Sequence, residues 1–228
     1  MSRPPRLELR AVSYRYVAAP RPALNSVQLD IAAGEIVGVV GPNEAGKSTL
    51  CLVASGFAPA SIGGTLTGEI RLDGVLMPTD APSKLAGRTG LLVAEPASQR
   101  SGITETVLEE VALGPVNLGL EVPATIERVR WAMGALGIDD LAGRHPANLS
   151  GGQAQLVAIA SILAMRPDLL VLDEPVAELD ADGRPRLVDA LRAMAAAGIA
   201  ILVAEHDTEF LAALGARIVT IRGGRLSA

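Results

Sequence analysis

The sequence is poor in aromatic residues and in cysteine. Its 228 residues include one Trp, two Tyr and two Phe, so the core must be built from aliphatic side chains and alanine. Cys51 is the single cysteine, which excludes an internal disulfide and fits a reducing compartment. There is no excess of positive charge either, because the formal net charge is -5. This balance argues against a protein that binds nucleic acid through bulk charge, and no nucleic-acid partner is expected.

Long apolar runs and a targeting segment are also missing. The apolar stretches 154–165 and 193–204 are shorter than the roughly 18 residues of a membrane span, so we expect buried elements there. The chain opens with Met1-Ser-Arg-Pro-Pro-Arg6, which is polar and rich in proline, unlike a signal peptide. We therefore expect a protein that is soluble or that sits on a membrane through a partner.

What the sequence does contain is a phosphate-binding loop. Residues 41–49 match the pattern G-x-x-x-x-G-K-S/T, with an apolar run of strand length before them and a segment that can form a helix after them. A glycine-rich turn that matches by chance is the alternative, but strand, loop and helix stand in the required order. The backbone N–H groups of such a loop face phosphate oxygens. Lys47 is placed to reach the β- and γ-phosphates, and Ser48 offers a hydroxyl to Mg²⁺. The predicted nucleotide-binding residues are Gly41, Pro42, Asn43, Glu44, Ala45, Gly46, Lys47, Ser48 and Thr49.

Strand and helix patterns alternate along most of the chain. The predicted strands are 7–16, 26–31, 35–40, 69–74, 89–94, 168–172, 199–204 and 216–220, and the predicted helices after Ser150 are 150–165, 182–197 and 207–214. The glycine- and proline-rich stretch 58–67 is expected to be a surface loop. Helical periodicity dominates 104–136, with breaks expected at Gly114-Pro115 and Val122-Pro123.

This order predicts an α/β fold, because strands that alternate with helices pair in parallel. We expect a P-loop NTPase core with a mostly parallel sheet and flanking helices, an N-terminal antiparallel β region and a helical insert. The whole chain, 1–228, would form a single domain. Its core would comprise 1–94 and 148–228, and 95–147 would form a helical subdomain.

Two carboxylates end an apolar strand at 168–174. Ligands of open α/β sheets gather at the carboxyl ends of the strands, so Asp173 and Glu174 should lie beside the phosphate-binding loop. Asp173 is then placed to hold Mg²⁺, directly or through water. Glu174 can orient and polarise the attacking water. The alternative, an acidic turn after a strand, is weak beside that loop.

A second helix start lies at Leu149-Ser-Gly-Gly-Gln153. Ser150 and Gln153 have the spacing of a capping box, which by itself would account for both residues. A cap does not require two successive glycines, however, and glycines there expose amides at a helix N-terminus, where anions bind. The chain thus carries two phosphate-binding ends, and one of them could serve a second subunit.

Taken together, the motifs resemble those of the ATP-binding-cassette (ABC) transporter ATPases over nearly the whole chain. The resemblance rests on Gly41–Thr49, Leu149–Gln153, Leu169–Glu174, Glu178-Leu-Asp180 and His206, in that order. In that family two cassettes dimerise head to tail and enclose ATP between the P-loop of one and the LSGGQ of the other.

The resemblance implies a role for several further residues. Across the dimer the γ-phosphate would be contacted by Ser150, Gly151, Gly152 and Gln153. Asp180 matches the D-loop aspartate at the interface, and His206 matches the switch histidine that touches the γ-phosphate. Tyr16 falls where the family stacks an aromatic ring on adenine; packing in the core is the other interpretation, and Tyr14 competes for the role.

A finer resemblance, to the energy-coupling-factor (ECF) branch, lies in 107–120 and 158–167. Those ATPases drive the uptake of vitamins and metal ions, with a transmembrane coupling protein and a substrate-binding membrane subunit. The resemblance implies ATP and Mg²⁺ as cofactors and a second ABC ATPase subunit, in a homo- or heterodimer. It also implies a peripheral position on the cytoplasmic face of the cell membrane.

The sequence departs from the family at several positions. Ala94 stands where the Q-loop glutamine is usual, before Glu95-Pro96, and Glu44 replaces a glycine of the P-loop. Leu156 replaces an arginine, and Glu178 replaces a small D-loop residue. The chain also ends at Ala228, without the C-terminal region of many ECF ATPases. These departures indicate one partner of an unequal pair, or a site with slow turnover. Two alternatives stay open beside an importer ATPase. One is a regulatory or weakly active cassette paired with a more active one, and the other is a non-transport ABC ATPase.

Overall fold

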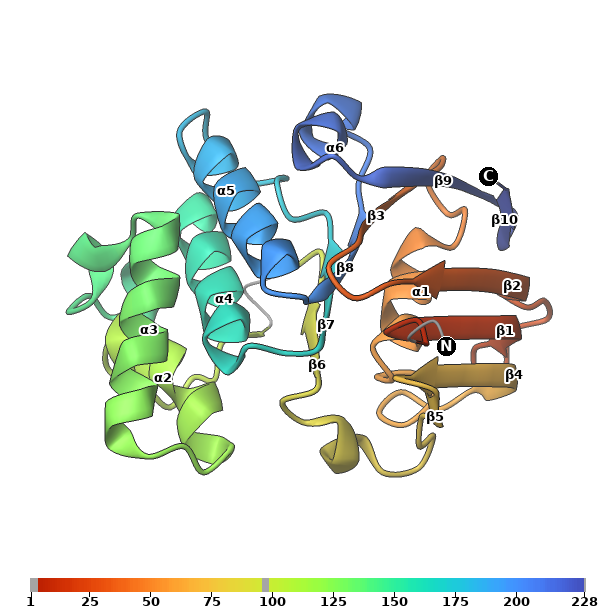
Figure 1. Ribbon diagram of the computed structural model, residues 1–228, viewed down its shortest axis with the longest axis horizontal. Coiled ribbons are helices and arrows are strands. Elements are labelled where there is room, and N and C mark those ends of the chain that lie inside the picture. Colours follow the sequence, from red (N-terminus) through yellow and green to blue (C-terminus); the bar gives the residue numbers. More distant parts are fainter. Residues whose placement is uncertain (1–3, 96–98, 228) are drawn as a thin grey trace.

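The computed structural model describes residues 4–95 and 99–227, which contain two sheets (Figure 1). The first sheet has four antiparallel strands in the order β2-β1-β4-β5. Its strands are β1 (Leu7–Arg15), β2 (Leu24–Ile31), β4 (Thr65–Leu72) and β5 (Val75–Leu76). Alternate residues of β1 and β2 are buried, as a sheet with one covered face requires.

The second sheet has six strands in the order β10-β9-β3-β8-β7-β6. Its strands are β3 (Ile36–Val40), β6 (Thr89–Leu92), β7 (Leu169–Asp173), β8 (Ala200–Ala204), β9 (Arg217–Arg222) and β10 (Arg225–Ser227). Five of them run parallel, and β10 pairs antiparallel with β9. Since parallel strands end at the same edge, the segments that follow β3, β7 and β8 lie side by side there.

Helices cover both faces of this second sheet (Figure 1). They are α1 (Lys47–Ala54), α2 (Val107–Asn117), α3 (Val122–Leu136), α4 (Gly151–Met165), α5 (Gly183–Ala196) and α6 (Thr208–Leu214). Every residue of β7 and β8 is buried, and successive side chains point to opposite faces. Leu170 and Val203 join a core with helices α2 to α6, whereas Val171 and Leu202 join a core with α1 and the four-stranded sheet.

The α/β class and the parallel sheet are confirmed, but several local expectations are wrong. First, the loop expected at 58–67 ends early, because β4 begins at Thr65 and pairs with β1. Second, α2 continues through Gly114-Pro115 to Asn117 instead of breaking there. Proline so near the end of a helix removes a single hydrogen bond. A Cβ on Gly114 would lie 2.8 Å from Cγ of Met165, so this glycine lets α2 pack closely against α4.

Strand β6 ends at Leu92, two residues earlier than expected, where a side chain takes over its pairing. The N–H of Val93 donates to Oε1 of Gln99 (2.9 Å), and Nε2 of Gln99 donates to the carbonyl of Leu91 (2.7 Å). Gln99 thus satisfies the edge of the sheet as a neighbouring strand would. Ala94 and Glu95 follow as exposed residues, and Pro96 lies outside the described residues.

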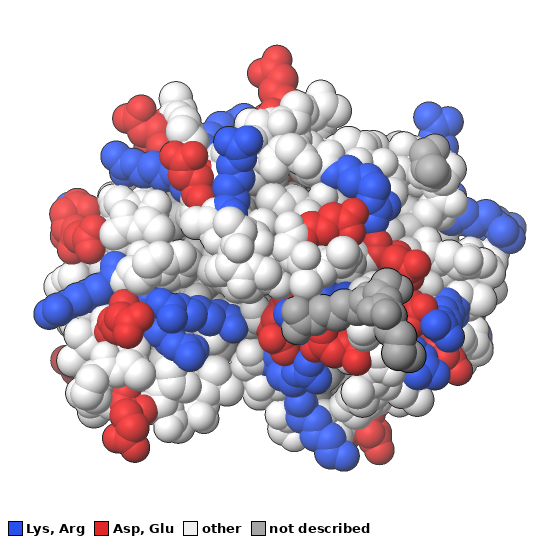
Figure 2. Space-filling view, viewed as in Figure 1, with Lys and Arg blue, Asp and Glu red and all other residues white. Residues whose placement is uncertain are grey.

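Two properties of the molecule bear on its surroundings. Among the helices of residues 4–95 and 99–227, none has the length and apolar character needed to cross a bilayer. On the face shown in Figure 2, basic and acidic side chains are interspersed rather than separated into regions of one sign.

Candidate functional site

The loop between β3 and α1 forms an open cradle. Gly46 has φ +108°, and a Cβ there would lie 2.9 Å from the carbonyl oxygen of Ala23, so a larger residue does not fit. Glu44 adopts φ 61°, a left-handed conformation that costs energy in any residue with a Cβ. In the described part of the chain no side chain caps α1. The N–H groups of its first turn therefore remain available to an anion.

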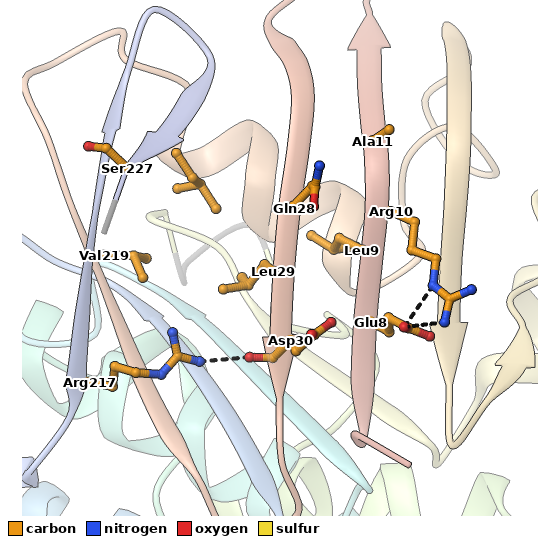
Figure 3. Close-up of a pocket in the computed structure, with 11 residues that line it drawn as sticks. Glu8, Leu9, Arg10, Ala11, Gln28, Leu29, Asp30, Arg217, Val219 and Ser227 are labelled. Carbon is orange, nitrogen blue, oxygen red and sulfur yellow. Dashed lines mark hydrogen bonds and ion pairs between the residues drawn. The ribbon is translucent and has the colours of Figure 1, made fainter.

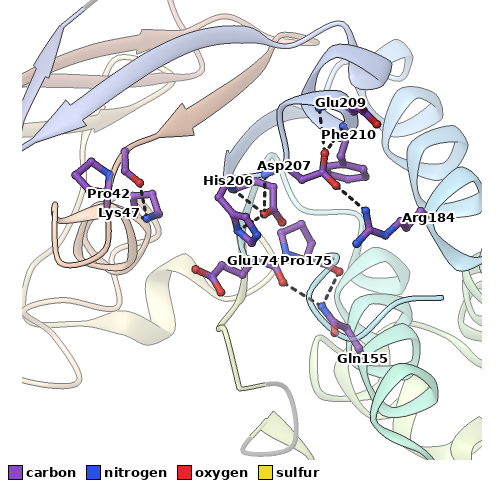
Figure 4. A network of polar contacts seen from close by, with 12 residues as sticks. Pro42, Lys47, Gln155, Glu174, Pro175, Arg184, His206, Asp207, Glu209 and Phe210 are labelled. Atoms are coloured by element: carbon purple, nitrogen blue, oxygen red, sulfur yellow. Dashed lines mark hydrogen bonds and ion pairs between the residues drawn. The ribbon is translucent and has the colours of Figure 1, made fainter. Parts of the chain in front are cut away.

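Lys47 lies over this cradle. Its side chain is largely buried, and Nζ donates hydrogen bonds to the carbonyls of Gly41 (2.9 Å) and Pro42 (3.2 Å; Figure 4). These carbonyls belong to the same loop that would hold phosphates. The ammonium group is therefore kept at the site and needs only a short movement to reach a bound phosphate.

A cavity of about 360 Å³ opens above the cradle. Its lining consists of Ala23, Asn43, Glu44, Gly46, Lys47, Ser48, Thr49 and Glu174. The fold thus brings Glu174, more than a hundred residues away in sequence, to the same cavity as the P-loop. Two carboxylates, Glu44 and Glu174, face this cavity together with one ammonium group.

A larger cavity, of about 750 Å³, lies elsewhere, between β1, β2, β9 and β10 (Figure 3). Both guanidinium groups in its lining are already paired: Arg217 binds Glu35 (2.6 Å) and the backbone carbonyl of Asp30 (2.7 Å), and Arg10 binds Glu8. Its floor is apolar. We regard it as a seam between the two sheets, in contrast to the smaller cavity at the P-loop.

Asp173 ends β7 and is buried beside the cavity. Burial raises the pKa of its carboxyl group; a hydrogen bond with Ser48 and the charge of Lys47 act in the opposite direction, and Glu174 and Glu205 add to the increase. Its Oδ1 atom is buried and has no hydrogen-bond partner among the described residues. A bound cation would stabilise the ionised carboxylate and give Oδ1 a partner. Asp173 and Ser48 together therefore fit a Mg²⁺ ion.

The described residues contain no group of three or more His, Cys, Asp or Glu side chains that could hold a metal ion by themselves. Mg²⁺ does not require such a group, because it keeps several waters and completes its shell with substrate phosphates. Two protein oxygens next to a phosphate cradle are therefore a sufficient donor set.

Glu174 leaves the strand in an unusual backbone conformation. Its φ is 52°, its N–H donates to the carbonyl of Ala204 (2.9 Å), and its carbonyl accepts from Nε2 of Gln155 (3.2 Å). Held at both peptide groups, the residue turns out of the sheet toward the cavity (Figure 4). Left-handed backbone in a non-glycine residue persists where surrounding contacts fix it, and such positions cluster at functional sites.

His206 follows β8, the strand that pairs with β7 in the sheet. Its side chain is 72% exposed, and Nδ1 lies 2.9 Å from Oε1 of Glu205 (Figure 4). Asp207 then caps α6 by accepting the N–H groups of Glu209 and Phe210, and forms an ion pair with Arg184 (2.5 Å). The pKa of Asp207 is lowered, first by the hydrogen bond from the N–H of Phe210.

The segment Ser150–Gln153 lies apart from this cavity, at the start of α4 on the other face of the sheet (Figure 1). The capping box is present: Oγ of Ser150 accepts the N–H of Gln153 (3.3 Å), and Oε1 of Gln153 accepts the N–H of Ser150 (3.1 Å). None of these four residues lines the P-loop cavity. Within one chain the two predicted phosphate-binding ends are therefore not brought together.

An acidic side chain accompanies this helix start. A Cβ on Gly151 would lie 2.7 Å from Oε2 of Glu178, and one on Gly152 would lie 2.6 Å from the carbonyl oxygen of Glu178. Gly152 is therefore needed for close packing against the backbone, whereas the flexible side chain of Glu178 could move away from a Cβ on Gly151. Asp180, two residues further on, is exposed and accepts the N–H of Gly183 through Oδ1 (2.8 Å).

The two tyrosines differ in their surroundings. Tyr14 is fully buried and donates its hydroxyl to the carbonyl of Gly63 (2.6 Å), so it is a core residue. Tyr16 is half-buried, and its hydroxyl lies 3.1 Å from Oγ1 of Thr49 in the P-loop. Of the pair, Tyr16 is next to the nucleotide site, and its stacking on adenine stays a prediction.

Two residues of the site escaped sequence analysis. Gln155 is buried; Nε2 donates to the carbonyls of Glu174 and Pro175, and Oε1 accepts the N–H of Glu178 (3.1 Å), so it ties α4 to the loop after β7. Glu205 is buried between β8 and His206. The available signal was a polar residue within or directly after an apolar run.

The chain resembles known proteins along most of its length. The sequence profile of the ABC transporter family matches residues 24–177. The cobalt import ATP-binding protein CbiO of Rhodobacter capsulatus is 40% identical over 98% of this chain and 78% of its own length. The energy-coupling factor transporter ATP-binding protein EcfA of Methanothermobacter thermautotrophicus is 37% identical over 97% of this chain and 70% of its own length.

Solved structures agree with this. CbiO1 of Clostridium perfringens, part of the ABC transporter complex CbiONQ, superimposes with a TM-score of 0.83 at 29% identity, over 99% of this chain and 88% of that one. A dimeric ATP-binding cassette bound to ADP and phosphate gives a TM-score of 0.85 at 25% identity, over 97% of each chain. The chain thus belongs to the ABC transporter family, and it is an ATP-binding cassette with the P-loop NTPase fold that hydrolyses ATP.

Proposed function

We propose that this chain is the ATP-hydrolysing subunit of an ECF-type importer of a vitamin or a metal ion. The observation that carries the proposal is its likeness to CbiO and EcfA over nearly the whole chain, at 40% and 37% identity. The catalytic groups expected of such a subunit are present and, apart from the LSGGQ segment, gather at one edge of the sheet.

Each group has a distinct role in this proposal. The P-loop N–H groups and Lys47 bind and orient the phosphates of ATP. Ser48 and Asp173 hold Mg²⁺, which neutralises charge on the β- and γ-phosphates when it is bound. Glu174 lies in the same cavity, where its carboxylate accepts a hydrogen bond from the attacking water. His206 positions the γ-phosphate from the end of β8.

A second cassette completes the site. Each chain has one P-loop and one LSGGQ segment, and the cavity at the P-loop is lined by none of Ser150–Gln153. In a head-to-tail dimer these residues contact the γ-phosphate bound by the partner, with Asp180 at the interface. The dimeric state of a cassette of similar structure supports this arrangement.

The membrane subunits dock at a second cavity of about 280 Å³, between β6, α2 and α4. It is lined by apolar groups such as Val157 and Ile162 and by polar ones such as Gln99 and Glu110. Gln99 lines this cavity and bonds Leu91 and Val93, directly before Ala94–Glu95 in the chain. Docking of a transmembrane coupling protein, which works with a substrate-binding membrane subunit, places the cassette peripherally on the cytoplasmic face of the membrane.

A second candidate is a weakly active cassette that pairs with a more active ATPase. It is favoured by Ala94, which stands in place of the Q-loop glutamine. The methyl group of alanine cannot ligate Mg²⁺ or accept a hydrogen bond from water. It is also favoured by the carboxylate of Glu44 in the phosphate cavity, which repels a nucleotide electrostatically.

Turnover of the purified chain, alone and in an assembled complex, tests the proposal. The complex would contain a coupling protein and a substrate-binding membrane subunit encoded beside this chain, reconstituted in lipid nanodiscs. We expect co-purification and ATP hydrolysis that increases on assembly. Failure to bind those membrane subunits would contradict the importer. Hydrolysis that appears only when a different cassette is added would favour the second candidate.

A further inference from the structure

Glu205 is an acidic residue to which the proposed mechanism gives no role. It follows β8 directly, and its side chain is completely buried, with 0% exposed. Its N–H donates to the carbonyl of Val39 (3.1 Å), at the end of the strand that leads into the P-loop. Glu205 is thus fixed in the same rigid frame as the phosphate cradle.

The two oxygens of its carboxylate differ in their contacts. Oε1 accepts the backbone N–H groups of His206 (2.7 Å) and Asp207 (3.2 Å) and lies 2.9 Å from Nδ1 of His206. Oε2 is buried and has no hydrogen-bond partner among the described residues. Two backbone donors therefore hold one oxygen in place, and that oxygen faces the imidazole ring.

This contact bears on where the imidazole hydrogen lies. At 2.9 Å an ionised carboxylate oxygen can accept a hydrogen but repels a bare nitrogen, so the contact favours hydrogen on Nδ1 of His206. The chain has one other histidine, His145, whose Nδ1 accepts the N–H of Ala147 (3.1 Å). Nδ1 of His145 must therefore carry no hydrogen, so the hydrogen of the neutral ring lies on Nε2. The two histidines should therefore be opposite tautomers.

We propose that Glu205 is a positioning residue for ATP hydrolysis. It holds the exposed ring of His206 by Nδ1–H and thereby presents Nε2 to the bound nucleotide. The consequence for catalysis rests on the proposed role of His206 at the γ-phosphate. A ring that is 72% exposed would otherwise sample several rotamers, and fixing one of them in advance lowers the entropic cost of reaching the transition state.

The competing interpretation is purely structural: Glu205 would only satisfy the N–H groups of His206 and Asp207 in the turn before α6. Both interpretations predict that Glu205→Ala is harmful. They differ in the state of the imidazole ring and in whether the effect of Glu205 passes through His206.

The tautomers can be measured directly, without ATP hydrolysis. A long-range ¹H–¹⁵N spectrum of the labelled chain, at a pH where both rings are neutral, should show Nδ1–H for one histidine and Nε2–H for the other. His206→Gln should remove the Nδ1–H pattern. An Nε2–H pattern for His206 in the unaltered protein would overturn the proposal, whatever the outcome for transport.

Kinetics then test whether the contact matters for the reaction, in the assembled complex. Glu205→Ala should lower kcat at least about tenfold and change KM for ATP less than about twofold. Glu205→Gln should retain most of kcat, because its amide oxygen can accept the same N–H groups. In a His206→Gln background, Glu205→Ala should add less than about a twofold loss.

Asp207→Asn is the matched control. This neighbouring carboxylate contacts Arg184 and the first turn of α6 rather than the imidazole ring, so neither the tautomer nor kcat should change. Equal losses from Glu205→Ala with and without His206 would contradict a positioning role and leave only the structural one. If Glu205→Ala fails to fold, the tautomer of the unaltered protein still decides.

Discussion

The chain has two helix starts that are rich in glycine, and they differ in how they are satisfied. At α1 no side chain caps the helix within the described residues, the preceding Gly46 is left-handed, and Lys47 lies over a cavity. At α4, Ser150 and Gln153 cap each other, and the carboxylate of Glu178 lies against Gly151. The first end is prepared for phosphate in the single chain.

The second end is stable without phosphate. The side chains of Ser150 and Gln153 already bond some of the N–H groups that a γ-phosphate would bind. The acidic side chain of Glu178 lies next to Gly151, where further N–H groups are exposed. A helix start that is satisfied by its own residues can remain exposed in a monomer. The difference is what we expect if the cassette holds ATP at α1 and offers α4 to a partner cassette.

The largest effect should come from removing the ammonium group of Lys47 at the start of α1. Lys47→Ala removes the charge that compensates the β- and γ-phosphates, so ATP-dependent activity should fall at least about a hundredfold. Titration with a fluorescent ATP analogue and steady-state turnover would measure it. Unchanged affinity and turnover would mean that the uncapped end of α1 is not the nucleotide site.

Glu174→Gln should separate binding from hydrolysis. The amide cannot accept a proton from water, so turnover should fall about a hundredfold or more while ATP stays bound. If α4 serves a second cassette, this variant should accumulate as an ATP-held dimer on size-exclusion chromatography. A monomer at saturating ATP, also after addition of the partner cassette, would count against the shared site.

A smaller effect is expected at the departure from the family beside the site. Ala94→Gln should raise ATP hydrolysis several-fold, because an amide can contact Mg²⁺ and water, whereas Glu95→Ala should change it little. Both variants should be measured in the same complex at saturating Mg-ATP. No effect of Ala94→Gln, together with loss of activity in Glu95→Ala, would show that Glu95 fills the role of the glutamine.

Glu178 offers a way to make the two helix starts more alike. Glu178→Ser removes a negative charge beside Gly151, so a γ-phosphate should bind there more readily. In the Glu174→Gln background we expect the ATP concentration for half-maximal dimerisation to fall about two- to fivefold, with less dependence on salt. Glu127→Ser, an exposed acidic position on α3, is the control. An equal decrease of this ATP concentration in Glu178→Ser and Glu127→Ser would exclude a local effect of Glu178.

The start of α6 is a helix N-terminus that the side chain of Asp207 caps. It serves as a reference for the two glycine-rich helix starts, because it is satisfied without phosphate. Hydrogen bonds, first from the N–H of Phe210, lower the pKa of the Asp207 carboxyl in the folded state. Its contribution to stability is therefore complete above the ordinary aspartate range, near about pH 3.9, and disappears as pH falls through the lower folded value.

Asp207→Asn removes only the charge, so the free energy of unfolding should fall by less than about 1 kcal/mol at pH 7. Urea titrations from pH 7 downward would measure this difference. It should shrink as the carboxyl group of the unaltered protein becomes protonated. A difference that grows at acid pH would contradict the assigned cause.

Sequence patterns predicted the parts of the molecule that depend on local chemistry. The P-loop, the parallel α/β core and the capping box at Ser150 each follow from residue types at fixed spacing, because backbone conformation and hydrogen bonding act over a few residues. Gly114-Pro115 is the instructive failure. Proline predicts a helix break, but packing of α2 on α4 stabilises the helix past this point.

Tertiary structure alone decided which distant side chains meet. Sequence analysis left Tyr14 and Tyr16 as competitors, and their burial separated them. It named His206 but not the buried Glu205 that holds it, nor Gln155, which joins α4 to the loop after β7. A side chain's partner depends on how strands and helices pack, which no local spacing encodes. The loop expected to bind phosphate could therefore be read from the sequence, whereas the contacts that orient the side chains around it come from the packing of the two cores on the sheet.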